Sequence, residues 1–151
     1  MDKIDRHILA VLQNEGRISI ADLADRVGLS PSPCARRLKR LEDDGYIEDY
    51  QANLNKDRVG ITMTFFVEVS LNRHQEETIE IFESALLDMD EVINAHIVSG
   101  RYDYLLEVVS KNLAGYEAFT NKLHRIKSVK DIHTHLAVRK IADKRALPIY
   151  V

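Results

Sequence analysis

Cysteine, proline and glycine are all scarce in this chain, and each shortage excludes a class of protein. Cys34 is the only cysteine among 151 residues, so no intramolecular disulfide can form, as suits a reducing compartment. Three prolines are too few for a collagen-like or low-complexity chain. Six glycines are few for a protein that cradles nucleotides in glycine-rich loops.

Long apolar runs are missing too. No stretch approaches the roughly 20 apolar residues that a membrane-spanning helix requires. The charged start, MDKIDR, does not resemble a signal peptide. We therefore predict a cytoplasmic protein with no membrane partner. A hydrophobic fraction of 45% and a charged fraction of 30% are typical of a globular chain.

Motifs that mark common catalytic sites are also absent. The sequence contains no HExxH, GxSxG, P-loop or GxGxxG pattern, and no nucleophile stands beside a base. We predict no enzyme activity, no catalytic residues and no cofactor. His133 and His135 share one face of a predicted strand, as two metal ligands would. Because no third ligand stands at a convincing spacing, no metal site is predicted.

What the chain does contain begins with three short helices. Asp2 and Ser19 each precede an apolar stripe at helical spacing and are each followed three residues later by an acid, as helix caps often are. Gly28 is expected to end the second helix, and Ser30 with Pro31 to begin the third. The predicted buried stripes are Ile4, Ile8, Leu9 and Leu12, then Ile20, Leu23, Ala24 and Val27, and finally Cys34, Leu38 and Leu41.

The joint between the second and third helices, residues 28–30, is short enough for a helix-turn-helix, whose second helix enters the major groove of DNA. A net charge of -3 argues against a nucleic-acid partner, but phosphate binding depends on local potential. Four of the five positions 36–40 carry cations, and helical geometry turns them away from the apolar stripe. A solvated helix face is the alternative. The predicted DNA-binding residues are Ser30, then Ser32, Pro33 and Arg36 near base edges, and Arg37, Lys39 and Arg40 mainly on phosphates.

The segment after Gly45 divides the chain. Residues 46–52 alternate enough to predict a short strand, hence a small wing or a linker strand. Residues 51–60 (QANLNKDRVG) are predicted to be a linker. The chain is therefore expected to hold a DNA-binding domain over residues 1–50 and a second domain over residues 61–151.

The second domain is predicted to be α+β. Alternating apolar residues favour strands at 61–71, 92–98, 104–109 and 131–138, and helical stripes favour helices at about 75–87 and 113–126. The order β-α-β-β-α-β is that of a ferredoxin-like domain with an antiparallel sheet and helices on one face. Phe66 falls on the opposite face, which indicates that this face is covered, most simply in a homo-oligomer.

Both halves of the sequence resemble the Lrp/AsnC (feast/famine) family of transcription regulators. The matching segments are DKIDRHIL and GRISIADLADRVGLSPSPCARRLKRLEDDGYI in the first half, and HIVSGRYDYLLEV and IHTHLAVRKI in the second. The resemblance covers nearly the whole chain and keeps the order of the motifs. It implies a winged helix-turn-helix followed by a ferredoxin-like domain, and binding to double-stranded DNA.

The resemblance further implies homodimers that assemble into octamers or larger discs. It also implies an effector, a small amino acid bound between second domains of neighbouring dimers, and control of genes of amino-acid metabolism. A loop with exposed amides beside a glycine and a carboxylate would suit the ammonium and carboxylate of such a ligand. The residues that match the family's effector-binding positions are Gly100, Arg101, Tyr102, Asp103 and Tyr104 in the loop, and His135, Leu136 and Ala137 in the last strand.

Several of these residues have simpler alternative roles. Asp103 also suits the cap of a tight turn between strands. Tyr102 and Tyr104 suit either stacking on a ligand or packing at an oligomer interface. Cys34 lies on a buried stripe and is expected to be a core residue rather than a redox sensor. For the whole chain, the alternatives to an effector-responsive regulator are a sequence-tolerant architectural DNA-binding protein and a small-molecule-binding or enzymatic module.

Overall fold

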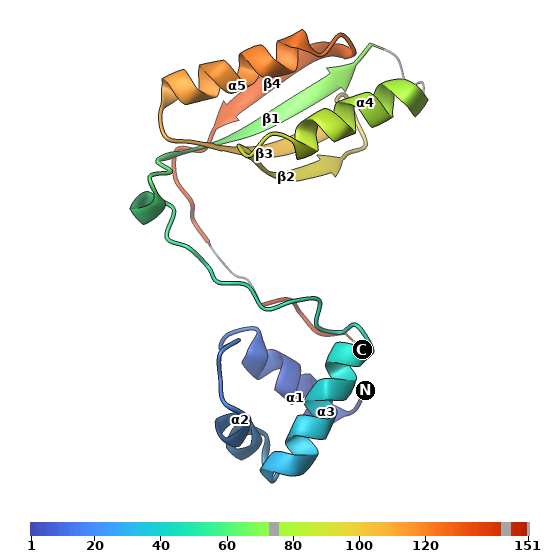
Figure 1. Cartoon of the computed structure of the whole chain (residues 1–151), viewed down its shortest axis with the longest axis vertical. Coiled ribbons are helices and arrows are strands. Elements are labelled where there is room, and N and C mark those ends of the chain that lie inside the picture. The colour runs from blue at the N-terminus through green and yellow to red at the C-terminus, as the bar shows by residue number, and fades with distance from the viewer. Residues whose placement is uncertain (73–75, 143–145, 151) are drawn as a thin grey trace. The chain divides into compact units, whose positions relative to one another are not determined.

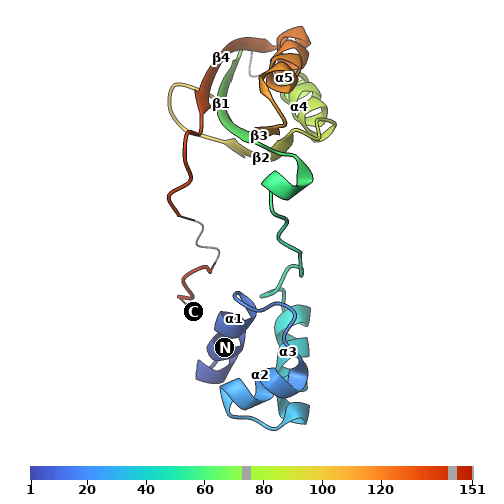
Figure 2. The ribbon, with the colours of Figure 1, turned by 90° about the vertical axis from the view of Figure 1, so that its left-hand side faces the viewer.

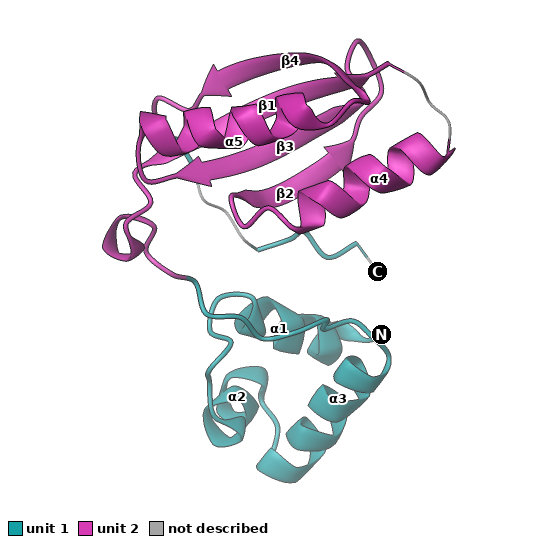
Figure 3. Cartoon of the chain, turned by 45° about the horizontal axis from the view of Figure 1, so that its top comes forward, with its two compact units in different colours: residues 1–53, 141–151 teal, residues 54–140 magenta. Residues whose placement is uncertain are grey.

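The computed structural model describes residues 1–72, 76–142 and 146–150, and the chain divides into two compact units (Figure 3). The first unit comprises residues 1–53 with 141–151, and the second comprises residues 54–140. The sequence analysis grouped the C-terminal residues with the second domain. In the structure the described ones, 141–142 and 146–150, group with the first unit instead.

Three helices form the first unit (Figure 1): α1 (Lys3–Leu12), α2 (Ile20–Val27) and α3 (Pro31–Asp43). Asp2 caps α1 in a full capping box with Asp5, and Ser19 accepts a hydrogen bond from the Asp22 amide at the start of α2. Gly28 ends α2 with a φ of 71°, a left-handed conformation that costs glycine little. The predicted stripes meet in one core of Ile8, Leu23, Ala24, Val27, Cys34 and Leu41.

Residues 46–52 form no strand, so the strand predicted there is wrong. Within the described residues the first strand begins only at Met63. Alternating side chains favour an extended backbone, but a strand also needs a neighbouring strand for its amide and carbonyl groups. Residues 46–52 pair with no strand among the residues that the structure describes.

The second unit has the predicted β-α-β-β-α-β order. Its elements are β1 (Met63–Leu71), α4 (Glu76–Leu87), β2 (Val92–Ile97), β3 (Tyr104–Ser110), α5 (Leu113–Arg125) and β4 (Val129–Leu136). The strands pair in the order β2-β3-β1-β4, and every pair is antiparallel. A short 3-10 turn, Asp57–Val59, lies within the predicted linker. The start predicted for α4 at Gln75 lies outside the described residues.

The last strand begins and ends earlier than predicted. The expected range was 131–138, whereas β4 runs from Val129 to Leu136 and leaves Val138 92% exposed. Pairing with β1 sets this range, because Leu71 lies opposite Val129 and Phe65 opposite Leu136. The apolar character of Val138 therefore did not determine where the strand ends.

Helices α4 and α5 both cover one face of the sheet (Figure 2). The core lies between them and the sheet, and its largest fully buried side chains are Phe82 and Phe119. Burying such a side chain stabilises a fold by about 1.5–3 kcal/mol. No helix among the described residues is both long and apolar enough to cross a membrane.

No helix of the described ranges covers the other face of the sheet, which we call the open face. It presents alternate residues of β1, including Phe66, which is 39% exposed, and Glu68. Because residues directly opposite in an antiparallel pair point to the same face, His133 and His135 of β4 lie there too. The open face therefore mixes an aromatic ring with ionisable groups.

Candidate DNA-binding and effector sites

Arg36 is the exposed cation of α3 that has no carboxylate partner. Among the described residues no ion pair and no hydrogen bond involves its guanidinium, whereas each of the other three cations of residues 36–40 contacts an acid. An exposed guanidinium offers five N–H donors in a planar fork, which suits guanine edges and phosphates.

Arg37 and Arg40 instead converge on one buried carboxylate. Asp5 of α1 is 1% exposed; its Oδ1 lies 2.8 Å from Nη1 of Arg37, and its Oδ2 lies 2.8 Å from Nη2 of Arg40. Arg37 also donates to Oδ2 of Asp2 at 2.6 Å. Burial alone would raise the pKa of Asp5, but the hydrogen bonds from the Asp2 amide and Arg37, with the charge of Arg40, lower it overall. These contacts join the middle of α3 to the start of α1.

The remaining cation of the group is exposed and locally paired. Lys39 lies 3.0 Å from Asp43, one helical turn further along α3, and the lysine side chain is 74% exposed. Such pairs contribute only about 0.3–0.5 kcal/mol, so Lys39 can exchange Asp43 for another anion at little cost.

The first turn of α3 lacks the usual donors of an anion-binding helix end. Ser30 occupies the cap position, but its hydroxyl accepts no capping hydrogen bond from the helix, contrary to the capping role expected of it. Pro31 and Pro33 have no backbone N–H, which leaves Ser32 as the donor between them. The start of α3 therefore presents small side chains and two rings rather than a cradle of amides.

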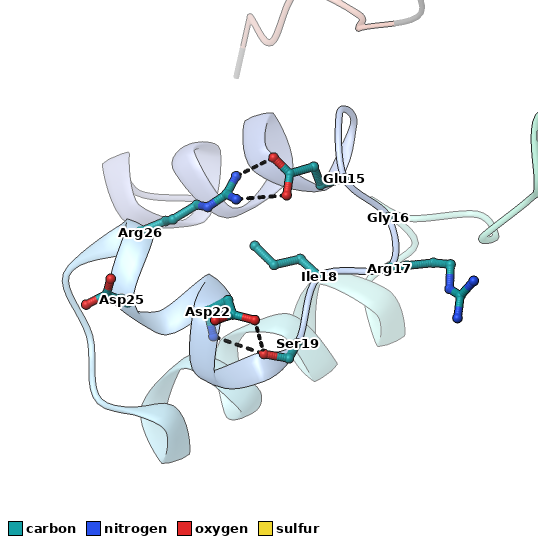
Figure 4. Close-up of a pocket in the computed structure, with 8 residues that line it drawn as sticks. All are labelled: Glu15, Gly16, Arg17, Ile18, Ser19, Asp22, Asp25 and Arg26. Carbon is teal, nitrogen blue, oxygen red and sulfur yellow. Dashed lines mark hydrogen bonds and ion pairs between the residues drawn. The ribbon is translucent and has the colours of Figure 1, made fainter.

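A surface hollow lies beside the start of α2, lined by the loop before this helix and by residues of the helix itself (Figure 4). Arg26 there donates two hydrogen bonds to the carboxylate of Glu15, at 2.5 and 2.8 Å. Arg17 points away from the other labelled side chains and is exposed. The sequence analysis did not select Arg17, because a single arginine in a loop has no pattern to distinguish it.

Cys34 is buried in the core of the first unit, as expected of a core residue. Its burial raises the pKa of the thiol, so the reactive thiolate is disfavoured.

The predicted effector loop follows β2 and is fixed to the end of β1. Gly100 has a φ of 132°, which residues with a side chain rarely adopt. Asp103 donates its amide to the Val69 carbonyl at 3.0 Å, and its Oδ2 accepts a hydrogen bond from the Leu71 amide at 2.7 Å. The Asp103 carboxylate thus caps the end of β1, a role other than the turn cap that was the alternative for this residue.

An aromatic contact joins this loop to the open face. The ring of Tyr102 lies roughly parallel to that of His133, with 6.1 Å between centroids. The guanidinium of Arg101 lies 5.3 Å from the Tyr102 centroid, within the range of a cation–π contact. His133 lies beside His135, whose Nε2 is 3.4 Å from Oε2 of Glu68. The sequence analysis missed Glu68, which is distant from all of these residues along the chain.

Two of the predicted effector residues point elsewhere. Tyr104 is 5% exposed on the helix-covered side, where its hydroxyl donates to Glu83 at 2.9 Å and its ring packs against Phe82. Burial raises the pKa of Tyr104 to about 12. Leu136 lies opposite the buried Phe65 and therefore also faces the helix side. The sequence analysis did not place Tyr104 in the core, although its alternation with Leu106 and Val108 is a signal that could have done so.

The two segments of the predicted effector site contact opposite ends of β1. The Asp103 amide bonds to Val69, and the Ala137 amide bonds to Thr64. Five residues of strand at about 3.4 Å each separate these points by about 17 Å. Tyr104 and Leu136 face the helix side whereas His135 lies on the open face, so a single copy of the chain does not bring all eight predicted residues to one face of the sheet.

Comparisons with known proteins match both units to one family. A winged helix-turn-helix DNA-binding model matches residues 1–48, and an Lrp/AsnC ligand-binding domain model matches residues 64–147. The chain is 39% identical over 150 residues to a leucine-responsive regulatory protein of Klebsiella pneumoniae, covering 99% of this chain and 92% of that one. The corresponding protein of Escherichia coli K12 is 38% identical with the same coverage.

Solved structures agree over the full length. A transcriptional regulator of Neisseria meningitidis in complex with L-methionine superposes with a TM-score of 0.94 at 34% identity, over 98% of this chain and 96% of that one. An AsnC-family regulator of Agrobacterium tumefaciens superposes with a TM-score of 0.92 at 36% identity, over 98% and 97%. The fold predicted from the sequence, a helix-turn-helix followed by a ferredoxin-like domain, is confirmed. The chain belongs to the Lrp/AsnC family of transcription regulators, with a DNA-binding unit and a ligand-binding domain.

Proposed function

We propose that this regulator reads double-stranded DNA with the outward face of α3, acting in the cytoplasm and without enzymatic activity of its own. The exposed guanidinium of Arg36, which has no partner within the described part of the chain, carries this proposal. Ser32 and Pro33 accompany it toward base edges, because they lie on the N-terminal part of the recognition helix. Lys39 and Arg40 bind phosphates, and Ser30 and the exposed Arg17 are further candidates for phosphate contacts.

Arg37 has a different part in this proposal. Its side chain is 28% exposed and is bound by two carboxylates, so a phosphate would have to compete with both. We therefore assign Arg37 to holding α3 against α1 rather than to the phosphate contacts expected from the sequence. Arg40 is 53% exposed and can bind Asp5 and a phosphate together.

A binding experiment with two neighbouring variants tests the DNA proposal. A specific site is first selected from random duplexes, and affinities for it and for a scrambled duplex are measured by anisotropy at several salt concentrations. Arg36→Ala should weaken specific binding about 10–100-fold and nonspecific binding much less. Lys39→Ala should weaken specific and nonspecific binding alike, and should reduce the slope of log affinity against log salt concentration by about one. Unchanged binding by both variants would remove α3 from the interface.

We further propose that the second unit binds a small free amino acid between copies of the chain. Support comes from the ligand-binding domain match and from the L-methionine held by the relative from Neisseria meningitidis. The separation of about 17 Å along β1 favours a site shared between copies, with Gly100–Asp103 of one copy facing residues 135–137 of another. Asp103 positions the loop by capping β1.

The open face suggests how copies associate. Its exposed Phe66 lies on a sheet face that no helix covers. Packing this face against a second copy would bury that ring and give a homodimer, which we propose assembles into octamers or larger discs. Light scattering of the wild type and of Phe66→Glu tests this: the charged variant should shift toward monomers, and equal masses would contradict the proposed interface.

The effector is tested by thermal shift against the twenty amino acids, with light scattering for each one that binds. At one hundred times Kd a ligand stabilises the native state by about 2.7 kcal/mol, which is readily seen. Asp103→Ala should abolish the shift while DNA binding persists. If no amino acid changes either the melting temperature or the mass of the wild type, the sensor proposal fails.

The same measurements address the architectural alternative. A regulator of particular genes should bind its selected site at least about 10³-fold more tightly than scrambled duplex at fixed salt. A ratio near one would instead favour sequence-tolerant compaction of DNA.

A further inference from the structure

Two strands of the second unit bring together three side chains that can ligate a metal. Glu68 of β1 lies directly opposite His133 of β4, and His135 lies opposite the neighbouring open-face residue, Phe66. Residues opposite one another or two apart in a strand share a face, so all three side chains project from the open face. Their nearest ligand atoms lie within 4.8 Å of one another.

We propose that Glu68, His133 and His135 form a binding site for a divalent transition-metal ion of the Zn²⁺ class. The sequence alone predicted no metal site, because the two histidines had no third ligand at a recognisable spacing. The sheet register supplies that ligand from a strand more than sixty residues earlier in the chain. This site uses no residue of α3 or of the Gly100 loop, and it shares His135 with the amino-acid site proposed above.

The distances suit the ion. Zn²⁺ binds imidazole nitrogen at about 2.0–2.1 Å and carboxylate oxygen at about 2.0–2.2 Å, so two ligands of a tetrahedral ion lie about 3.3–3.4 Å apart. Nε2 of His135 and Oε2 of Glu68 are already 3.4 Å apart. The nearest nitrogen of His133 lies within 4.8 Å of these two atoms, so the His133 side chain must turn toward them to complete the set.

The charge balance also favours a cation. Glu68 makes its ion-pair contact with His135, and within residues 1–72, 76–142 and 146–150 no lysine or arginine pairs with it. A divalent ion would neutralise this carboxylate. Two imidazoles with one carboxylate are the donor set that suits Zn²⁺ and its neighbours, whereas Mg²⁺ and Ca²⁺ prefer oxygen alone.

The neighbourhood leaves the ligands accessible and partly oriented. In a single copy of the chain the side chains of His135 and Glu68 are 55% and 33% exposed, so an ion can reach them from solvent before a second copy packs on the open face, and a water can be its fourth ligand. The ring of Tyr102 lies beside that of His133, with 6.1 Å between centroids, and limits the directions in which the imidazole can turn. The thiol of Cys34 cannot compete for the ion, since it is buried in the other unit.

Titration with Co²⁺, followed by displacement with Zn²⁺, tests the proposal on the untagged full chain. Wild type should bind one ion per chain with the visible absorption of four-coordinate Co²⁺. Glu68→Gln, His133→Gln and His135→Gln should each weaken binding at least tenfold. His96→Gln is the matched control. His96 lies opposite Leu105, and Leu105 lies opposite Glu68, so His96 is on the open face but outside the cluster.

Two results would overturn the site: absence of saturable binding by wild type, or an equal loss in His96→Gln. Circular dichroism of each variant checks that it is folded. If a variant does not fold, nuclear magnetic resonance of the wild type decides instead. Zn²⁺ should then shift the imidazole signals of His133 and His135 and leave those of His96 in place, and a shift of His96 alone would refute the assignment.

Discussion

Replacing Arg37 with alanine removes two hydrogen bonds to carboxylates, one of them to a buried group. The bond to Asp2 is worth little, because that carboxylate is 52% exposed. Asp5 is 1% exposed, and stranding such a group with no partner costs about 3–5 kcal/mol. Arg40 and the Asp2 amide still donate hydrogen bonds to Asp5 in the variant. We therefore expect the free energy of unfolding to fall by about 2–3 kcal/mol, the value of one charge-assisted hydrogen bond.

The loss is measured by urea and thermal unfolding of the full chain, followed by circular dichroism. For a unit of this size, about 2 kcal/mol lowers the melting temperature of its transition by roughly 10 °C or more. Arg36→Ala is the matched control, since Arg36 is exposed and its stability change should stay within about 0.5 kcal/mol. The two variants should therefore separate stability from DNA affinity. A melting temperature for Arg37→Ala equal to that of Arg36→Ala would refute the reasoning.

Three further predictions concern single groups. The folded-state pKa of Asp5 is lowered, so its carboxylate contributes to the free energy of unfolding above the unfolded pKa of about 3.9, and this contribution is lost as pH falls through the folded value. Asp5→Asn should therefore make the free energy of unfolding fall less steeply at acid pH. Gly28→Ala should lower the free energy of unfolding in urea by about 1 kcal/mol. Open space surrounds the added Cβ, so this loss comes from backbone strain at a φ of 71°, and no change would refute the strain. Tyr104→Phe should lower stability by about 1 kcal/mol through loss of the bond to Glu83, yet leave any amino-acid-induced thermal shift intact; loss of that shift would restore Tyr104 to the effector site.

Local chemistry in the sequence was sufficient to predict the helices and most strands. The caps at Asp2 and Ser19, the end at Gly28 and the alternation along residues 63–71 act over a few residues, so they are legible without coordinates. The strand predicted at residues 46–52 failed, because pairing needs a partner that local pattern does not reveal. The C-terminal limit of β4 moved for the same reason.

Which side chains meet was decided by tertiary structure. The cations of α3 formed one pattern in the sequence, but helix packing gave Arg37 and Arg40 to the buried Asp5 and left Arg36 exposed. The sheet register likewise placed Glu68 beside His135, although the two are 67 positions apart. Sequence periodicity fixes the face on which a residue lies, because that depends on the backbone's own repeat. The partner across that face depends on how elements distant in the chain are packed, and only the folded chain determines it.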